Sequence, residues 1–256
     1  MAGNNIDLTG KAALVTGASK GIGAAVAALL ARHGATVGVH YGRDRAAAAG
    51  VLADLAGSGH GLLEADLADP GAAAELPDRA AELLGRLDIV VNNAGIFEPH
   101  DIAGLDRDDW RQAWSRTLAV NLDAPAHIIQ GAIAHLERAG GGHIVNISSR
   151  GAYRGEPEAP AYGASKAGLN SLTQSLARAL APRNIHVVGV APGWVLTEMT
   201  RDHLAGQGGQ EIRAQSPLNR TAEPDEIAQV VLLAVSGRSD ALTGSIIDVN
   251  CASYFR

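Results

Sequence analysis

The chain has 256 residues, 46% of them hydrophobic and 19% charged, and this balance is typical of a globular protein rather than a disordered one. Its formal net charge is −6 and no basic stretch is interleaved with aromatic residues, so neither nucleic acid nor a membrane surface is an expected partner. The single cysteine, Cys251, excludes a disulfide framework and a cysteine-rich metal site, so we expect no metal and a reducing compartment. No secretory signal and no bilayer-spanning apolar run is visible, so we expect a cytoplasmic protein.

Short apolar segments alternate with longer segments of helical period. The predicted strands are 12–15, 35–39, 62–66, 87–93, 143–148, 185–191 and 245–249. The predicted helices are 21–33, 44–56, 70–84, 162–181 and 224–235, with a long helical region over 106–138. Apolar strands separated by helices are typical of a parallel sheet covered on both faces. We therefore predict an α/β, doubly wound (Rossmann) fold with a seven-stranded parallel sheet, as a single domain over residues 1–256.

The segment TGASKGIG, residues 16–23, lies between the first predicted strand and the first predicted helix. Gly17, Gly21 and Gly23 would allow a tight turn and the close approach of a pyrophosphate, which a helix N-terminus attracts. The same residues match G-x-S-x-G, which would make Ser19 the nucleophile of a hydrolase. That motif usually lies mid-chain, and no oxyanion motif of the HGGG type occurs. A phosphate-binding turn is favoured; a hydrolase and a purely structural turn are the alternatives.

The end of the second predicted strand bears on the choice of dinucleotide. Many sites of this kind carry an acidic residue about 20 positions after the glycines, where it binds the ribose 2′-hydroxyl. Here the strand ends at Tyr41, Arg43 follows, and Lys20 lies within the glycine turn. These cations suit a 2′-phosphate, so NADP(H) is favoured and NAD(H) stays possible. The alternative is that Arg43 and Arg45 belong to a solvated helix start, and Asp44 between them weakens the preference.

The segment YGASK places Tyr162 and Lys166 on one face of a helix, at positions i and i+4. A phenol titrates near 10, and a neighbouring ammonium stabilises the phenolate and lowers its pKa. Such a pair can exchange a proton with a carbonyl or alcohol oxygen. Ser149 ends one predicted strand and NNAG, residues 92–95, ends another, where ligands of open α/β sheets bind. Taken alone, these features would be a surface pair, a helix cap and an ordinary turn.

Together, TGASKGIG, NNAG, VNL at 120–122, ISS at 147–149, YGASK at 162–166 and PGWVLT at 192–197 closely resemble the motifs of the classical short-chain dehydrogenase/reductase family, in order and spacing. The resemblance implies that Tyr162 is the general acid/base and that Lys166 lowers its pKa and binds the nicotinamide ribose. It implies that Ser149 binds the substrate oxygen and that Asn121 supports a proton relay through water. It makes Ser19 a cofactor contact rather than a nucleophile.

The same resemblance implies a cofactor site that draws on residues from most of the chain. Asp66 would face the adenine, the NNAG residues would line the adenosine and ribose, and the PGWVLT segment would hold the carboxamide of the nicotinamide. The complete set of cofactor residues is Gly17, Ser19, Lys20, Gly21, Ile22, Gly23, Tyr41, Arg43, Asp66, Leu67, Asn93, Ala94, Gly95, Tyr162, Lys166, Pro192, Gly193, Val195 and Thr197.

Assembly and substrate are less determined. The resemblance implies a homotetramer in which the helices near 106–138 and 162–181 pack between subunits. The layout is similar to 3-oxoacyl-(acyl-carrier-protein) reductases, so an acyl-carrier protein is a possible partner; Arg183 stands where such reductases place a basic residue, and Gly140 replaces another. The family commonly ends its last strand with Gly-Gly, whereas this sequence reads DVNCAS over residues 248–253.

The substrate is expected to be a small carbonyl or alcohol compound. Its pocket would be formed by the residues after Ser149, by Phe97 to His100, and by a Gly-rich loop over about 194–218. Arg150, Tyr153, Arg154 and Trp194 hint at a polar or anionic compound. A sugar or polyol dehydrogenase and a secondary-metabolite ketoreductase are equally open. A nucleotide-binding sensor or partner subunit without catalysis is the alternative from another class.

Overall fold

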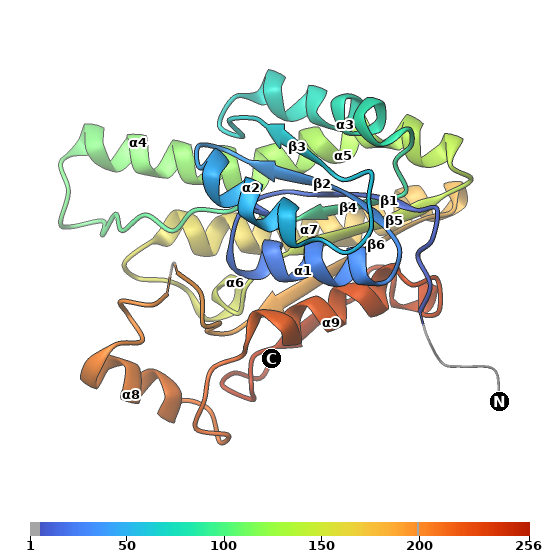
Figure 1. The fold of residues 1–256 in the computed structure, drawn as a ribbon. Helices are drawn as coiled ribbons and strands as arrows, with labels where there is room; N and C mark the ends of the chain where they lie inside the picture. Colours follow the sequence, from blue (N-terminus) through green and yellow to red (C-terminus); the bar gives the residue numbers. More distant parts are fainter. Residues whose placement is uncertain (1–5, 199) are drawn as a thin grey trace.

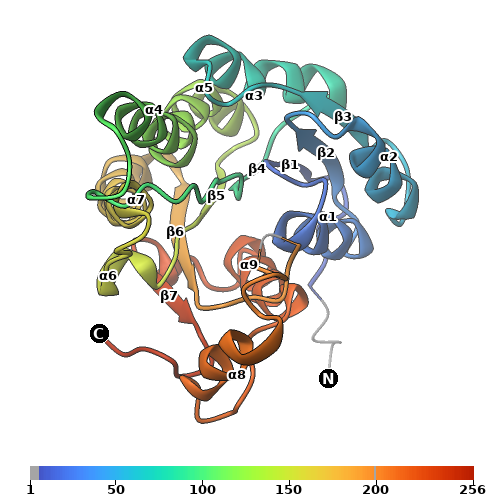
Figure 2. The ribbon, with the colours of Figure 1, turned by 90° about the vertical axis from the view of Figure 1, so that its left-hand side faces the viewer.

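The computed structural model describes residues 6–198 and 200–256. In this part of the chain, parallel strands form one seven-stranded sheet in the order β3-β2-β1-β4-β5-β6-β7 (Figures 1 and 2). The strands are β1 (Ala12–Val15), β2 (Thr36–Tyr41), β3 (Gly61–Glu64), β4 (Ile89–Asn92), β5 (Gly142–Ile147), β6 (Ile185–Pro192) and β7 (Ile246–Val249). The predicted doubly wound fold is confirmed.

Helices connect successive strands and cover the sheet. They are α1 (Gly21–Arg32), α2 (Arg45–Asp54), α3 (Pro70–Leu84), α4 (Arg107–Leu118), α5 (Ala124–Arg138), α6 (Gly151–Arg154), α7 (Pro160–Leu180), α8 (Gly206–Ala214) and α9 (Pro224–Val235). Three short turns complete the set: a π-helical turn η1 (Ala119–Asp123) and two 3₁₀ turns, η2 (Ala181–Arg183) and η3 (Asp240–Leu242). None of the helices in the described residues is long and apolar enough to cross a membrane.

Two apolar cores lie on opposite faces of the sheet, because successive side chains of a strand point to opposite faces. On one face, α1 and α9 pack on Val15 and Val91 (Figure 1). On the other, α3, α5 and the end of α7 pack on Leu14 and Val90. Burial on both faces explains why the strands read as continuous apolar runs in the sequence.

The strand order reverses between β1 and β4, and this places a crevice at the carboxyl ends of the strands. Figure 2 looks onto that end of the sheet. Buried amides join the central strands there: Asn92 Nδ2 donates to Asn146 Oδ1 at 2.9 Å, and Asn146 Nδ2 donates to Thr173 Oγ1 of α7 at 2.9 Å. These bonds fix the helix that carries Tyr162 and Lys166 relative to the ends of the two strands.

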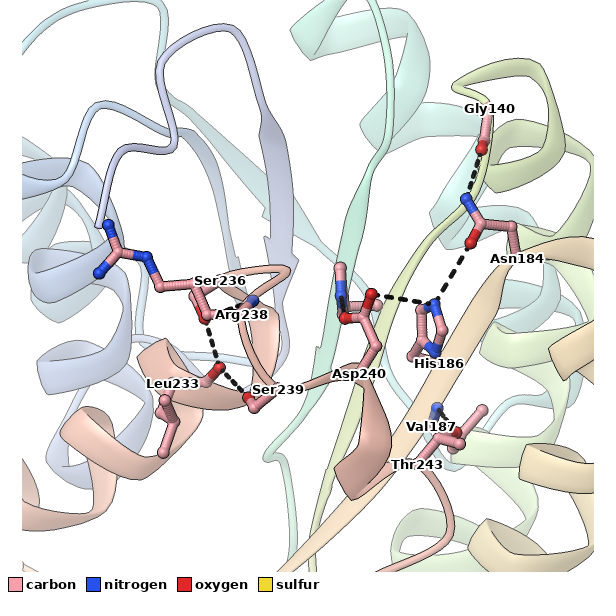
Figure 3. Close-up of polar contacts among 11 residues, drawn as sticks. Gly140, Asn184, His186, Val187, Leu233, Ser236, Arg238, Ser239, Asp240 and Thr243 are labelled. Atoms are coloured by element: carbon pink, nitrogen blue, oxygen red, sulfur yellow. Dashed lines mark hydrogen bonds and ion pairs between the residues drawn. The ribbon is translucent and has the colours of Figure 1, made fainter. Parts of the chain in front are cut away.

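Polar side chains also close the opposite, amino-terminal edge of the sheet (Figure 3). Asn184, in the left-handed conformation with φ 56°, donates from Nδ2 to the carbonyl of Gly140 at 2.9 Å. Asp240 lies 3.1 Å from Nε2 of His143 and 3.6 Å from Nε2 of His186. These contacts tie the starts of β5 and β6 to the turn before β7.

Two predicted segments differ from the structure. The expected loop over about 194–218 contains α8, which begins within its glycines; Gly209 is buried, and a Cβ there would overlap the Leu204 carbonyl. The expected helical region over 106–138 is interrupted by the π-helical turn η1, which carries Asn121. Extra residues of this kind in a helix often occur at functional sites.

The chain turns back on itself after β7 through two non-glycine residues in the left-handed conformation. Cys251 has φ 53° and Ala252 has φ 57°, at the place where the family resemblance implies a Gly-Gly pair. The turn is held by the Ser253 N–H, which donates to the Asn250 carbonyl at 3.0 Å. L-residues other than glycine are disfavoured in this conformation by about 1–2 kcal/mol each.

Replacing Ala252 with glycine is expected to stabilise the protein, because relief of the left-handed strain exceeds the added entropy of the unfolded chain. We expect a gain of about 0.5–1 kcal/mol in the free energy of unfolding, measured by urea denaturation. Ala53→Gly in the exposed part of α2 is the matched control and should destabilise by about 1 kcal/mol. An Ala252→Gly protein no more stable than the wild type would contradict this account.

Candidate active site

A cleft with a cavity of about 570 Å³ opens at the carboxyl ends of the strands. Its walls bring the glycine turn together with residues that lie more than a hundred positions further along the chain. The predicted residues that line it are Gly17, Ser19, Lys20, Gly21, Ile22, Arg43, Asp66, Leu67, Asn93, Ala94, Gly95, Ser149, Tyr162, Lys166, Pro192, Gly193, Val195 and Thr197. Of the predicted catalytic and cofactor residues, three do not line it: Gly23, Tyr41 and Asn121.

The glycine turn has the geometry that a pyrophosphate requires. Gly17 and Gly21 have positive φ values of 61° and 56°, and a Cβ on Gly17 would lie 2.9 Å from Cα of Ala94. Lys20, which precedes α1, provides no side-chain cap, so N–H groups at the start of this helix remain available to an anion. The turn therefore fits the phosphates of a dinucleotide.

The turn is bonded to the end of β4. Thr16 Oγ1 accepts hydrogen bonds from the backbone N–H groups of Asn93 and Ala94, both at 3.0 Å. In return, Asn93 Nδ2 donates to the carbonyls of Thr16 at 2.9 Å and Gly17 at 3.1 Å. A Cβ on Gly23 would overlap the Gly17 carbonyl, so this glycine contributes close packing rather than a cofactor contact.

His40 supports the turn from β2, and the sequence interpretation missed it. It is 2% exposed; its Nδ1 accepts from the Gly17 N–H at 3.0 Å, and its Nε2 lies 3.2 Å from the Ala65 carbonyl. Burial disfavours the charged ring and lowers the pKa of His40 to about 4. A histidine inside an apolar strand looks like an ordinary core residue; its position one residue before the end of the strand is the signal that could have identified it.

Tyr41 is oriented differently from the prediction. Its ring is buried, its hydroxyl donates to Glu64 Oε2 at 2.8 Å, and Arg45 donates to that hydroxyl at 3.1 Å. Strand alternation puts His40 and Gly42 on the cleft side instead. The Tyr41 side chain therefore points away from the cleft, and its place in the cofactor site stays a prediction.

The cations that favoured a 2′-phosphate have unequal surroundings. Arg43 lines the cleft, and Asp44 beside it caps α2 by accepting from the Ala47 N–H at 2.9 Å. Lys20 Nζ lies 2.7 Å from Glu198 Oε2, with side chains 60% and 58% exposed. Glu198 was not predicted, and its carboxylate competes with a phosphate for Lys20.

Ser149, Tyr162 and Lys166 meet at the other end of the cleft. Lys166 is 4% exposed; its Nζ donates to the Ile147 carbonyl at 2.8 Å and lies 5.8 Å from the centroid of the Tyr162 ring. Ser149 Oγ accepts from the Gly151 N–H at 3.0 Å, which leaves its hydroxyl proton for another acceptor.

The protonation of this group is governed by burial. Burial raises the pKa of Tyr162 above its usual value, and a hydrogen bond with Ser149 opposes the rise. Burial lowers the pKa of Lys166 to about 8. Burial has the largest effect on Tyr162, and the charge of Glu156 raises its pKa further. The lowering of this pKa by Lys166 stays a prediction.

Asn121 does not line the cleft itself but is hydrogen-bonded to the loop that forms part of its wall. In η1, it accepts on Oδ1 from the Ile96 N–H at 2.8 Å and donates from Nδ2 to the Ile96 carbonyl at 3.0 Å. Nδ2 also lies 3.3 Å from Ser165 Oγ, and that hydroxyl donates to the Tyr162 carbonyl at 2.7 Å. Asn121 therefore connects the loop after β4 to the helix of Tyr162.

A row of aromatic rings begins at Tyr162. The Phe97 ring is edge-on to it, with centroids 5.1 Å apart, and His203 lies 6.4 Å from Phe97 and 5.8 Å from Trp194. We call Phe97, His203 and Trp194 the aromatic rim.

The Arg150 side chain, in contrast, is hydrogen-bonded within the protein. It is 4% exposed and donates to Ser253 Oγ and to Gln215 Oε1, both at 2.7 Å. Burial lowers the pKa of Arg150 to about 10. The prediction that this guanidinium receives a polar or anionic substrate gains no support from its contacts.

Comparison with known proteins agrees with this geometry. A family model described as enoyl-(acyl carrier protein) reductase matches residues 17–251. The chain is 36% identical to an L-rhamnose 1-dehydrogenase (NAD(P)(+)) of Sphingomonas sp. over 96% of its length and 97% of that protein's. It is 35% identical to the 3-oxoacyl-[acyl-carrier-protein] reductase FabG of Staphylococcus aureus over 95% and 98%. A crystal structure of a dehydrogenase/reductase from Sinorhizobium meliloti 1021 superimposes with a TM-score of 0.88 at 34% identity, covering 98% of both chains.

A doubly wound sheet with a glycine turn, and with serine, tyrosine and lysine in one cleft, defines a nucleotide-dependent oxidoreductase. The chain belongs to the short-chain dehydrogenase/reductase family, with a layout like that of the FabG reductases, and its substrates are carbonyl or alcohol compounds.

Acid is expected to destabilise the protein through His40. Its pKa is 6.5 in the unfolded chain and about 4 when folded, so between these values the unfolded state binds more protons. The contribution of His40 to the free energy of unfolding is complete above pH 6.5. It is lost progressively as the pH falls toward 4, by about 3 kcal/mol from this one residue. Urea denaturation of the wild type and of His40→Asn at several pH values measures it. A variant with an undiminished pH slope over this range would rule out His40 as the cause.

Proposed function

We propose that this protein is an NADP(H)-preferring oxidoreductase that transfers a hydride between the nicotinamide and a carbonyl or secondary alcohol carbon, with Tyr162 as the general acid/base. The observation that carries the proposal is the convergence of the glycine turn with Ser149, Tyr162 and Lys166 on a single cleft. The relatives named as dehydrogenases and reductases support the same class of reaction.

The cofactor would be held along the whole cleft. The uncapped start of α1 and the glycine turn would bind its phosphates, Asp66 and the Asn93–Gly95 segment its adenosine and ribose, and Pro192 to Thr197 the carboxamide of the nicotinamide. Arg43 would receive the 2′-phosphate. When bound, NADP(H) supplies or accepts the hydride.

The protein's own residues handle the substrate oxygen and its proton. The Ser149 hydroxyl, which retains its proton, would donate to the oxygen and orient it. Burial raises the pKa of Tyr162, so at neutral pH the phenol is protonated and ready to donate to the alkoxide that forms during reduction. In oxidation the phenolate must form, and the Lys166 ammonium stabilises it across the ring.

Tyr162→Phe tests the proposed acid/base. The ring and its packing against Phe97 are kept and the proton donor is removed, so we expect kcat to fall by about 10² to 10⁴ while the Kd for NADPH stays within a few-fold. Steady-state assays with a panel of ketones and alcohols, and fluorescence titration of NADPH, measure the two quantities.

The same variant separates the alternatives. Unchanged turnover in Tyr162→Phe would overturn the mechanism, and a protein that binds NADPH but reduces no compound would favour a sensor. For a hydrolase, Ser19 would need a base, yet no side chain among residues 6–198 and 200–256 hydrogen-bonds to its hydroxyl, and His40 Nδ1 is occupied by the Gly17 N–H. Ester cleavage abolished by Ser19→Ala would restore that reading.

Cofactor preference is tested by thermal unfolding with NADPH, NADH or neither. A ligand that binds only the native state stabilises by about 2.7 kcal/mol at a hundredfold excess over Kd, so the ligand that binds more tightly gives the larger rise in Tm. We expect the larger shift with NADPH, because Arg43 lines the cleft close to the end of β2.

Paired variants distinguish the cations from the rest of the site. Arg43→Gln should reduce the NADPH shift and leave the NADH shift unchanged. Glu198→Gln frees Lys20 from its ion pair and should strengthen NADPH binding several-fold, again with little effect on NADH. A larger shift with NADH in the wild type would overturn the proposed preference and leave the oxidoreductase assignment standing.

Substrate and assembly complete the proposal. The segment 194–218, which includes α8, and the aromatic rim would define the substrate pocket of a single domain. A homotetramer would pack through the α4–α5 region and α7. A carrier-linked acyl substrate is less favoured than a free one, because Arg183 pairs with Glu137 at 3.0 Å and precedes β6, at the sheet edge opposite the cleft.

A further inference from the structure

His100 lies in the loop between β4 and α4 and is completely buried. Its backbone N–H donates to the Glu158 carbonyl at 2.7 Å. Both ring nitrogens have backbone partners: Nδ1 lies 2.6 Å from the Glu98 carbonyl, and Nε2 accepts from the Ala161 N–H at 2.9 Å. The indoles of Trp110 and Trp114 in α4 pack edge-on against it, with centroids 6.3 and 6.5 Å away.

These contacts fix the chemical state of the ring. The Ala161 N–H can only donate, so Nε2 must carry a lone pair. The Glu98 carbonyl can only accept, so Nδ1 must carry the proton. His100 is therefore neutral, with one nitrogen as donor and the other as acceptor, and both are used.

The acceptor completes the first turn of α7, the helix that carries Tyr162 and Lys166. Ala159, which precedes this helix, provides no side-chain cap, and Pro160 has no N–H. The N–H groups of Tyr162 and Gly163 both donate to the Ala159 carbonyl, at 2.9 and 3.4 Å. The remaining N–H of the turn belongs to Ala161, which is fully buried, and His100 is its partner.

The same loop carries the ring that contacts the phenol. Ile96 at one end is bonded through both backbone groups to Asn121, and His100 at the other end is bonded to the Glu158–Ala161 segment. Phe97 lies between these two anchors, against Tyr162. His100 thus restrains Tyr162 twice, through the helix backbone beside it and through the loop that packs on its ring.

We propose that His100 is a positioning residue for Tyr162: its neutral imidazole caps the N-terminus of α7 from outside the helix and fixes the phenol in the cleft. This rests on the proposed role of Tyr162 as the acid/base. His100 is not among the residues that line the cleft. Its removal therefore affects the chemical step and spares cofactor binding, since misplacement of a reacting group by about 1 Å can cost a hundredfold in rate.

The test compares two carboxamides that differ by one methylene. In His100→Gln, the amide reaches the position of Nε2 and its oxygen can accept from the Ala161 N–H. In His100→Asn, the amide stays at the level of Nδ1 and leaves that N–H without a partner. We expect kcat to stay within about threefold of wild type for Gln and to fall at least tenfold for Asn, with the Kd for NADPH unchanged in both. His100→Leu, which fills the space without an acceptor, should behave like Asn.

Equal kcat in the Gln and Asn variants, or wild-type kcat in a folded His100→Leu, would overturn the proposal. Circular dichroism and NADPH binding show which variants are folded; if the leucine variant is not, the Gln and Asn pair decides alone. Tyr162→Phe, measured in parallel, distinguishes a failure of the proposed function from a failure of the proposed role of His100. An active Tyr162→Phe protein means that the proposed function fails, whereas an inactive one beside a fully active His100→Asn means that only the role of His100 fails.

Discussion

All seven strands run in the same direction, so their carboxyl ends must meet at one edge, and the chain reverses its order there between β1 and β4. Every functional feature of the molecule depends on this constraint. A crevice at a reversal has no strand or helix to satisfy the polar groups on its walls, so side chains must do so. Thr16 and Asn93 bond the two walls to each other, and the Asn92–Asn146–Thr173 chain ties α7 to the ends of β4 and β5.

The end of the cleft that holds Lys166 contains a buried charge bonded to a carbonyl oxygen. Lys166 is buried beside a carbonyl oxygen rather than a carboxylate, so its charge is only partly compensated and its pKa falls to about 8. A carboxylate partner would stabilise the ammonium and would also neutralise its field at Tyr162. The partly compensated charge costs folding free energy.

The sequence was sufficient for the architecture and for the prediction that Ser149, Tyr162 and Lys166 lie in one cleft. Continuous apolar strands have few alternatives to a covered parallel sheet, and Tyr162 and Lys166 could be proposed because tyrosine and lysine are scarce in this chain and these two stand four residues apart. Residues that act through orientation were missed or misread. His40 and Tyr41 are neighbours in β2, and only the register of the sheet decides that the histidine faces the glycine turn. Arg150 looked like a substrate ligand because nothing in its local sequence shows that Gln215 and Ser253 approach it from far along the chain.

The contacts of Arg150 have a mechanical consequence. This guanidinium follows Ser149 directly and joins Gln215, at the end of α8, to Ser253 in the C-terminal turn. A swing of α8 that breaks the bond to Gln215 removes a partner from a buried cation, and the strain falls one residue away from the hydroxyl that would bind the substrate oxygen. The end of α8 is thus tied to a buried charge, and its position is coupled to the backbone beside Ser149.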